Sequence, residues 1–125
     1  MAKRILVADD EEEIREIIAF VLGRHGFAVD AVSGERELQE ALARYLPDLI
    51  ILDVMMPGTD GYRICYELLK DPKTQHIPVI MMTAHDEEIY QRISHDLGVA
   101  QHITKPFHPL DLAGRVVALL KGETP

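Results

Sequence analysis

The sequence has few of the features that mark secreted or membrane-bound proteins. Its 125 residues include one cysteine, Cys65, so no disulfide can form within the chain, which suits a reducing compartment. No apolar run is long enough to cross a bilayer, and the stretch MAKRILVADD lacks the unbroken apolar segment of a signal peptide. These absences predict a cytoplasmic protein that does not enter a membrane.

Clusters of basic residues are also absent. The 13 Lys and Arg residues form no run, and 21 Asp and Glu residues give a formal net charge of -8 at pH 7. Because phosphate recognition rests on clustered Lys and Arg, the sequence argues against direct binding to nucleic acid or to an anionic membrane. With 47% hydrophobic residues, the chain is the size of one domain with one substantial core. We therefore expect a single domain over residues 1–125.

Short apolar segments alternate with amphipathic ones along the chain. The apolar segments predict strands at residues 4–9, 27–32, 49–53, 78–83 and 100–104. Apolar residues at helical spacing between and after them predict five helices. The fourth of these has only a narrow stripe, made of Ile89, Ile93 and Leu97. The alternation predicts an α/β fold, a doubly wound five-stranded parallel sheet with helices on both faces.

Polar residues follow four of the five predicted strands. In the stretch DLIILDVMMPGTDG, Asp53 directly follows an apolar run, and the other strand ends carry Asp9 with Asp10, Thr83, and Lys105. In open parallel sheets, ligands bind beyond the carboxyl ends of the strands, where the direction of the connections reverses. We therefore expect these residues to converge at one edge of the sheet.

Each of these residues also has an ordinary structural explanation. Asp9 or Asp10 could cap the first helix, Asp53 could serve the following turn, and Thr83 could cap the fourth helix. Lys105 alone is typical of a solvated surface charge. The occurrence of all of them at one edge is much harder to explain in this way and favours a functional site.

The predicted cluster has a chemical logic. Three neighbouring carboxylates repel one another unless a cation neutralises them, and Mg²⁺ is the natural choice because it takes one or two protein carboxylates and keeps water and phosphate oxygens. Asp53 could then attack a phosphoryl group and form an aspartyl phosphate. Lys105 and the Thr83 hydroxyl would contact the new phosphate oxygens.

Four motifs in order, ILVADDE, PDLIILDVMMPGTDGYRIC, IPVIMMTA and ITKPF, resemble the receiver domain of two-component response regulators over essentially the whole chain. The resemblance implies a flavodoxin-like fold and a phosphorylation-activated signalling switch that is not an enzyme. It implies that Asp53 is the phosphoacceptor, that Asp10 binds Mg²⁺ directly and Asp9 through water, and that Met55 offers its backbone carbonyl. It also implies a cis peptide bond between Lys105 and Pro106.

The resemblance further implies partners. The phosphoryl donor would be a histidine kinase or a histidine phosphotransfer protein, and the output would act on a downstream effector domain or protein. Signalling would use the fourth helix, the fifth strand and the fifth helix, and a phosphorylation-dependent homodimer is one form of output.

Several residues depart from the family pattern. His102 stands where the family commonly has a rotating Tyr or Phe switch residue; it could switch in a pH-dependent way, or be an exposed strand-end residue. His85 lies where the family often tunes dephosphorylation. The acidic pair of one receiver subgroup is replaced by Ala100 and Gln101, so we expect Arg115 to lack its partners and that subgroup's dimer to be doubtful.

Proteins of other classes fit the same residues less well. A haloacid dehalogenase-type phosphatase would need a second Asp where Met55 stands. A flavodoxin-like flavin binder would place its phosphate beside Asp9 and Asp10, which would repel it. An interaction module that has lost phosphorylation would not need the complete set of strand-end residues.

Overall fold

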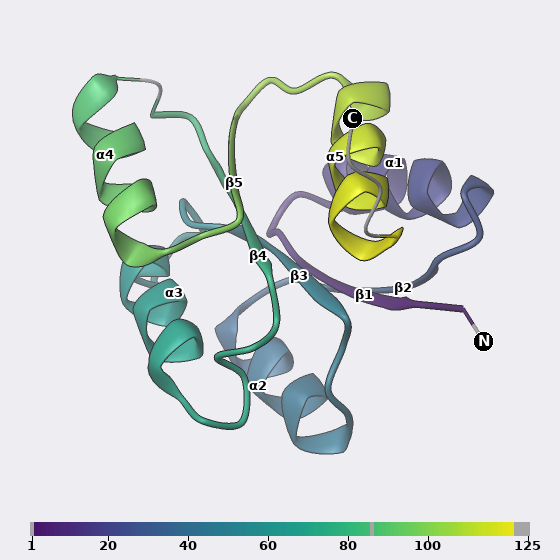
Figure 1. The fold of residues 1–125 in the computed structure, drawn as a ribbon, viewed down its shortest axis with the longest axis horizontal. Helices are drawn as coiled ribbons and strands as arrows, with labels where there is room; N and C mark the ends of the chain where they lie inside the picture. Colours follow the sequence, from purple (N-terminus) through teal and green to yellow (C-terminus); the bar gives the residue numbers. More distant parts are fainter. Residues whose placement is uncertain (1, 86, 122–125) are drawn as a thin grey trace.

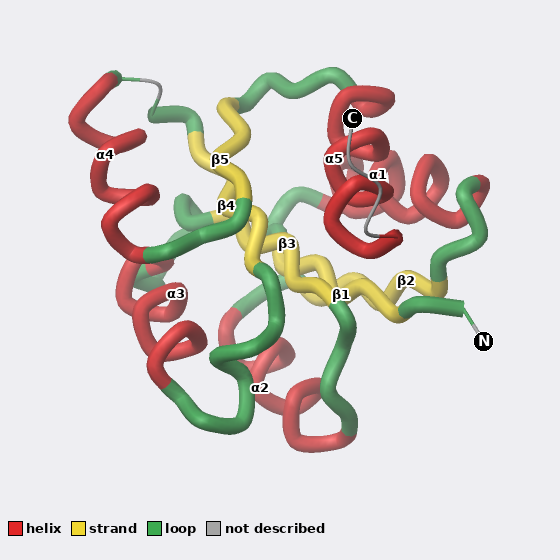
Figure 2. The backbone as a smooth tube through the Cα atoms, in the orientation of Figure 1, coloured by secondary structure: helices red, strands yellow, loops and turns green. Residues whose placement is uncertain are grey.

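The computed structural model describes residues 2–85 and 87–121. Five parallel strands form one sheet in the order β2-β1-β3-β4-β5 (Figures 1 and 2). The strands are β1 (Arg4–Ala8), β2 (Ala28–Val32), β3 (Leu49–Asp53), β4 (Val79–Thr83) and β5 (Gln101–Thr104). Each begins and ends within one residue of its predicted bounds, and the predicted fold class is confirmed.

Helices cover both faces of the sheet, with α1 and α5 on one side and α2, α3 and α4 on the other (Figure 1). Their bounds are α1 (Glu12–Arg24), α2 (Glu35–Arg44), α3 (Gly61–Lys70), α4 (Glu88–Leu97) and α5 (Pro109–Lys121). The chain moves outward from β1 to β2 and then returns to place β3 on the other side of β1. In open parallel sheets, ligands bind at such a reversal, which here lies beyond the carboxyl ends of β1 and β3.

The two helical layers produce two apolar cores. Successive side chains of a strand point to opposite faces, so Leu6 and Ala8 join the core under α2 and α3, whereas Ile5 and Val7 join the core under α1 and α5. Strands β3 and β4 are buried along their whole length. This burial holds their carboxyl ends rigidly.

The segment after β3 folds back tightly because Gly61 has no side chain. A Cβ atom at this position would lie 2.2 Å from the Cα of Val54, far closer than atoms can approach. Asp60 precedes α3 as its N-cap and accepts a hydrogen bond from the Arg63 amide at 3.2 Å. The close approach at Gly61 and this cap fix where α3 starts relative to Asp53.

The predicted packing face of α4 is wrong for two of its three residues. Ile89 and Ile93 are 57% and 37% exposed, while the buried residue of the helix is Ser94. Leu97 packs on the core as predicted, and the other residues of the inner stripe are Tyr90 and Ser94. A pattern of apolar residues could not identify this stripe because the Ser94 hydroxyl is buried through hydrogen bonds.

Arg115 lacks the acidic pair of the family, as expected from Ala100 and Gln101, but it has other partners. Its Nη1 atom donates to Gln101 Oε1 at 2.7 Å, and its Nε atom donates to Asp111 Oδ2 at 3.0 Å. A neutral amide on β5 and a carboxylate one helical turn away thus serve in place of the acidic pair. Among the described residues, no helix is long and apolar enough to cross a membrane.

Candidate functional site

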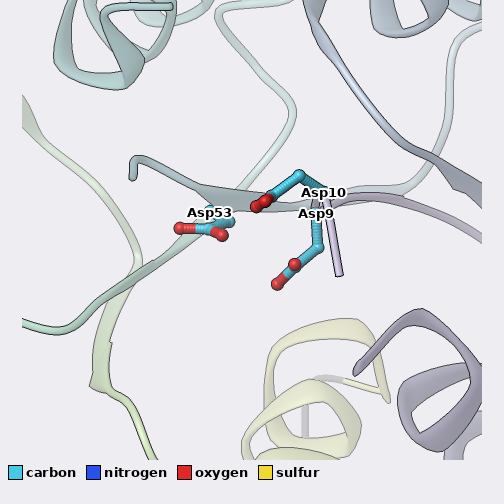
Figure 3. A group of neighbouring side chains, drawn as sticks. All are labelled: Asp9, Asp10 and Asp53. Carbon is cyan, nitrogen blue, oxygen red and sulfur yellow. The ribbon is translucent and has the colours of Figure 1, made fainter. Parts of the chain in front are cut away.

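The polar strand-end residues converge at the carboxyl edge of the sheet. Figure 3 shows the Asp10 side chain directed toward Asp53, with Asp9 beside it. Asp9, Asp10 and Asp53 can each offer one carboxylate oxygen such that all three oxygens lie within 4.8 Å of one another. Residues 43 or more positions apart in the chain thus meet because β1 and β3 are neighbours in the sheet.

Lys105 reaches this cluster from the end of β5. Its Nζ atom lies 2.8 Å from Asp9 Oδ2 and 3.0 Å from Asp53 Oδ2, and 3.4 Å from Glu11 Oε1. The peptide bond between Lys105 and Pro106 is cis, as the resemblance implied. The ammonium therefore bridges the two buried carboxylates in this structure.

Three of the strand-end side chains also stabilise the turns that follow them. Asp9 Oδ1 accepts from the Glu11 amide and Asp53 Oδ1 from the Met55 amide, both at 2.8 Å. Thr83 Oγ1 accepts from the His85 amide at 3.0 Å. The turn explanation for Asp53 is thus correct but incomplete, because Asp53, like Asp9, directs its second oxygen to Lys105 in the shared site. The capping explanations are wrong: the N-cap residue of α1 is Glu11, not Asp9 or Asp10, and that of α4 is Glu87, not Thr83.

Burial differs sharply among the three carboxylates. Asp9 is 0% exposed and Asp53 is 2% exposed, whereas Asp10 is an exposed residue. Burial raises the pKa of Asp53; hydrogen bonds from the Met55 amide and Lys105 offset part of this effect, and the charge of Asp9 adds to it. Burial alone would lower the pKa of the Lys105 ammonium, but its hydrogen bonds to Asp9 and Asp53 outweigh that effect and raise it.

The donor set fits a hard divalent cation. Three carboxylates and one ammonium leave the cluster with a formal charge of about -2, and oxygen ligands of this kind suit Mg²⁺. The exposed Asp10 leaves one side of the cluster open to solvent, as an ion that retains several waters requires. Met55 follows closely after Asp53, and its side chain is 44% exposed.

An aromatic group beside Thr83 was not predicted from the sequence. Thr83 is fully buried, and the ring of His85 stacks on that of Tyr90 with centroids 4.1 Å apart. Tyr62 from α3 lies 6.3 Å from the Tyr90 ring. Among the described residues, His85 Nδ1 is buried without a hydrogen-bond partner. Tyr62 is distant in the sequence from the other three residues, and no spacing pattern could have revealed the group.

Arg15 was also missed. Its Nη1 atom donates to the backbone carbonyl of Asp9 at 2.8 Å, so it holds the loop that carries the first two aspartates. His102 lies on β5, opposite Met81 of β4. Its Nδ1 atom is 2.7 Å from Ser94 Oγ, which excludes the exposed strand-end alternative.

Comparison with known sequences agrees with this geometry. A family model described as the response regulator receiver domain matches residues 5–117. The chain belongs to this family. Membership favours the receiver interpretation over the phosphatase and flavin-binding alternatives, since the matched segment contains the strand-end residues of the cluster.

Curated relatives of this receiver domain are longer proteins. The chain is 40% identical over 129 residues to the phosphate regulon transcriptional regulatory protein PhoB of Escherichia coli, covering 100% of this chain and 55% of PhoB. It is 40% identical over 122 residues to the alkaline phosphatase synthesis transcriptional regulatory protein PhoP of Bacillus subtilis, covering 97% of this chain and 50% of PhoP. The receiver domain thus spans about half the length of these relatives.

Solved receiver structures share the fold. The signal receiver domain of a histidine kinase from Syntrophus aciditrophicus matches with a TM-score of 0.87 and 36% identity, covering 97% of this chain and 92% of that chain. The phosphorylated cyanobacterial phytochrome response regulator RcpA matches with a TM-score of 0.85 and 26% identity, covering 99% and 98%.

Proposed function

We propose that this receiver domain accepts a phosphoryl group on Asp53 and works as a phosphorylation-activated switch. The observation that carries the proposal is the position of Asp53. Its carboxylate is buried at the end of β3, within 3.0 Å of the Lys105 ammonium and close to two further carboxylates. A nucleophile held in this way is presented in one orientation to an incoming phosphoryl group.

The chain's own residues have separate tasks in the transfer. A carboxylate oxygen of Asp53 bonds to phosphorus as the bond between phosphorus and the donor's leaving atom breaks. Lys105 lies at hydrogen-bonding distance from Asp53 and would contact a phosphoryl oxygen, while the Thr83 hydroxyl would donate to another. Neither residue needs to gain or lose a proton.

Asp9, Asp10, Asp53 and the backbone carbonyl of Met55 would hold Mg²⁺. When bound, the cation would neutralise negative charge on the phosphoryl oxygens. The carboxylate cluster and its opening at Asp10 support this assignment.

The donor would be a histidine kinase or a histidine phosphotransfer protein, as the family implies. The curated relatives are transcriptional regulatory proteins of which this chain spans about half, which supports an effector domain or protein as the target of the switch. The output surface would be the α4-β5-α5 face, on which Ile89 and Ile93 are exposed. A homodimer formed through this face on phosphorylation is part of the proposal.

The proposal is tested by measuring intact mass after incubation with acetyl phosphate, with and without Mg²⁺. We expect one labile phosphoryl group, dependent on Mg²⁺, and its loss in Asp53→Ala. Asp60→Asn is the matched control, since Asp60 is an exposed aspartate in the same loop and the asparagine can still cap α3. A comparable gain of labile mass by Asp53→Ala would refute the acceptor assignment. No gain by the unmodified chain would favour a phosphorylation-independent interaction module.

A further inference from the structure

The hydroxyl of Ser94 is the point at which α4, β4 and β5 meet. Ser94 is 1% exposed and is the buried residue of α4. Its Oγ atom lies 3.0 Å from Met81 Sδ on β4, 3.0 Å from the Tyr90 carbonyl and 2.7 Å from His102 Nδ1 on β5. The contact with His102 is therefore a hydrogen bond between the middle of this helix and the edge strand.

The second ring nitrogen of His102, Nε2, differs from Nδ1 in its hydrogen bonding. Among the described residues, His102 Nε2 is buried and has no hydrogen-bond partner. In a neutral imidazole one nitrogen donates and the other accepts, so Nδ1–H can donate to Ser94 while Nε2 remains a bare acceptor. In a protonated imidazole both nitrogens donate, and Nε2–H would be a buried charged donor without a partner.

We propose that His102 and Ser94 form a proton-sensitive latch, in which neutral His102 holds α4 against β5 and protonated His102 releases it. Ile89 and Ile93 face outward, so the inner contacts of this helix come from Tyr90, Ser94 and Leu97. A cavity of about 330 Å³ between α4 and β5 is lined by both latch residues and gives the imidazole room to leave.

The other charged or titratable side chains near His102 do not account for proton sensing by the latch. From α4, His95 lines the same cavity, but its side chain is 90% exposed and pairs with Asp96. The neighbour of His102 on β4 is Met81, which carries no charge. On α5, Arg115 and Asp111 bond to each other, and Arg115 bonds to Gln101, the residue before His102. Gln101 and His102 point to opposite faces of the sheet, so these charges lie across β5 from the ring.

The latch goes beyond the proposed function and can be tested without phosphorylation, so the two can fail separately. The measurement is amide hydrogen exchange of α4 in the unphosphorylated chain at about pH 8 and about pH 6, corrected for the intrinsic pH dependence of exchange. We expect protection of the α4 amides to fall about fourfold at the lower pH, which is the most that proton binding by one ordinary imidazole can produce over this interval, while the amides of β3 keep theirs.

Two substitutions at the latch and one beside it assign the effect. His102→Gln keeps a polar side chain that cannot be protonated and should make α4 protection independent of pH. His95→Gln removes the exposed histidine of the same cavity and should leave the pH dependence unchanged. Ser94→Ala removes the hydroxyl and should lower α4 protection at both pH values. Equal protection in the unsubstituted chain at both pH values, or a pH dependence lost in His95→Gln, would overturn the proposal.

Discussion

At the scale of single residues, Lys105 makes the contacts that best distinguish the two states of the proposed switch. Its ammonium already bridges Asp9 and Asp53, and phosphorylation would raise the negative charge at Asp53 from about -1 to about -2. At about 4 Å and an effective dielectric near 20, one extra charge is worth on the order of 4 kcal/mol. The added attraction is present only in the phosphorylated state, which is the requirement for a switch.

We therefore predict that Lys105→Ala uncouples phosphorylation from its output. The variant should still accept phosphate, though more slowly, and should show much smaller changes in α4 and around His102. Amide NMR shifts with and without beryllofluoride, a phosphoryl mimic, would measure this. Lys73→Ala, at an exposed position after α3, is the control and should respond fully. A full response by Lys105→Ala would show that the switch does not use this contact.

Asp53 provides a second prediction at this scale. Because burial raises its pKa, its ionised form destabilises the folded, metal-free domain. This penalty is complete above the folded pKa and is lost as the pH falls through that value toward the unfolded one. Asp53→Asn should therefore raise the free energy of unfolding at pH 7, by on the order of 1 kcal/mol, the usual size of a single-site effect.

The comparison needs urea unfolding of both proteins without Mg²⁺, at neutral pH and at a pH near 4. The gain from Asp53→Asn should shrink at the lower pH because the aspartate then becomes neutral as well. If the asparagine variant were less stable at neutral pH, the ion pair with Lys105 would outweigh the cost of burying the carboxylate.

At the scale of elements, the sequence pattern was sufficient to predict those elements whose buried side chains are all apolar. Strands β3 and β4 were predicted to within a residue because they are nearly continuous apolar runs. Such a run can be identified from the sequence without knowledge of its partners in the fold. Helix α4 was placed correctly, but of its three predicted packing residues only Leu97 packs on the core. Its inner face contains Ser94, whose burial depends on partners from β4 and β5 that no local pattern contains.

The corrected orientation of α4 gives a prediction for its outer face. Ile89→Ser with Ile93→Ser should change the free energy of unfolding by little, within about 0.5 kcal/mol for each site, because both side chains already face solvent. Leu97→Ala should cost more, about 2 kcal/mol, since Leu97 packs on the core under α2 and α3. Urea unfolding of the three proteins would compare them.

The same double variant tests the proposed homodimer. Light scattering after gel filtration, with and without beryllofluoride, should show a mimic-dependent dimer in the unsubstituted chain and a monomer in the double variant. A dimer that survives loss of both isoleucines would have to use another surface.

At the scale of the whole molecule, the site was predictable because of the topology. Once a parallel sheet is inferred, the residues that end its strands must share an edge, so Asp9, Asp53 and Lys105 could be grouped without coordinates. The separate roles of these residues could not be predicted from the sequence. That Lys105 neutralises two carboxylates, while Asp10 stays exposed, depends on side-chain geometry across three strands.

The last prediction concerns how metal binding and folding stability are coupled in the whole domain. Asp10 is the exposed member of the carboxylate cluster, so Asp10→Asn removes a repelling charge without breaking the bonds that Lys105 makes to Asp9 and Asp53. The variant should unfold at a higher temperature than the unsubstituted chain when no metal is present, and Mg²⁺ should raise that temperature less. Thermal unfolding over a series of Mg²⁺ concentrations measures both effects. Glu16→Gln, which removes one exposed negative charge from α1, controls for the change in net charge. If Asp10→Asn lowered the unfolding temperature of the metal-free domain, or left its response to Mg²⁺ unchanged, the carboxylates would not share one cation site.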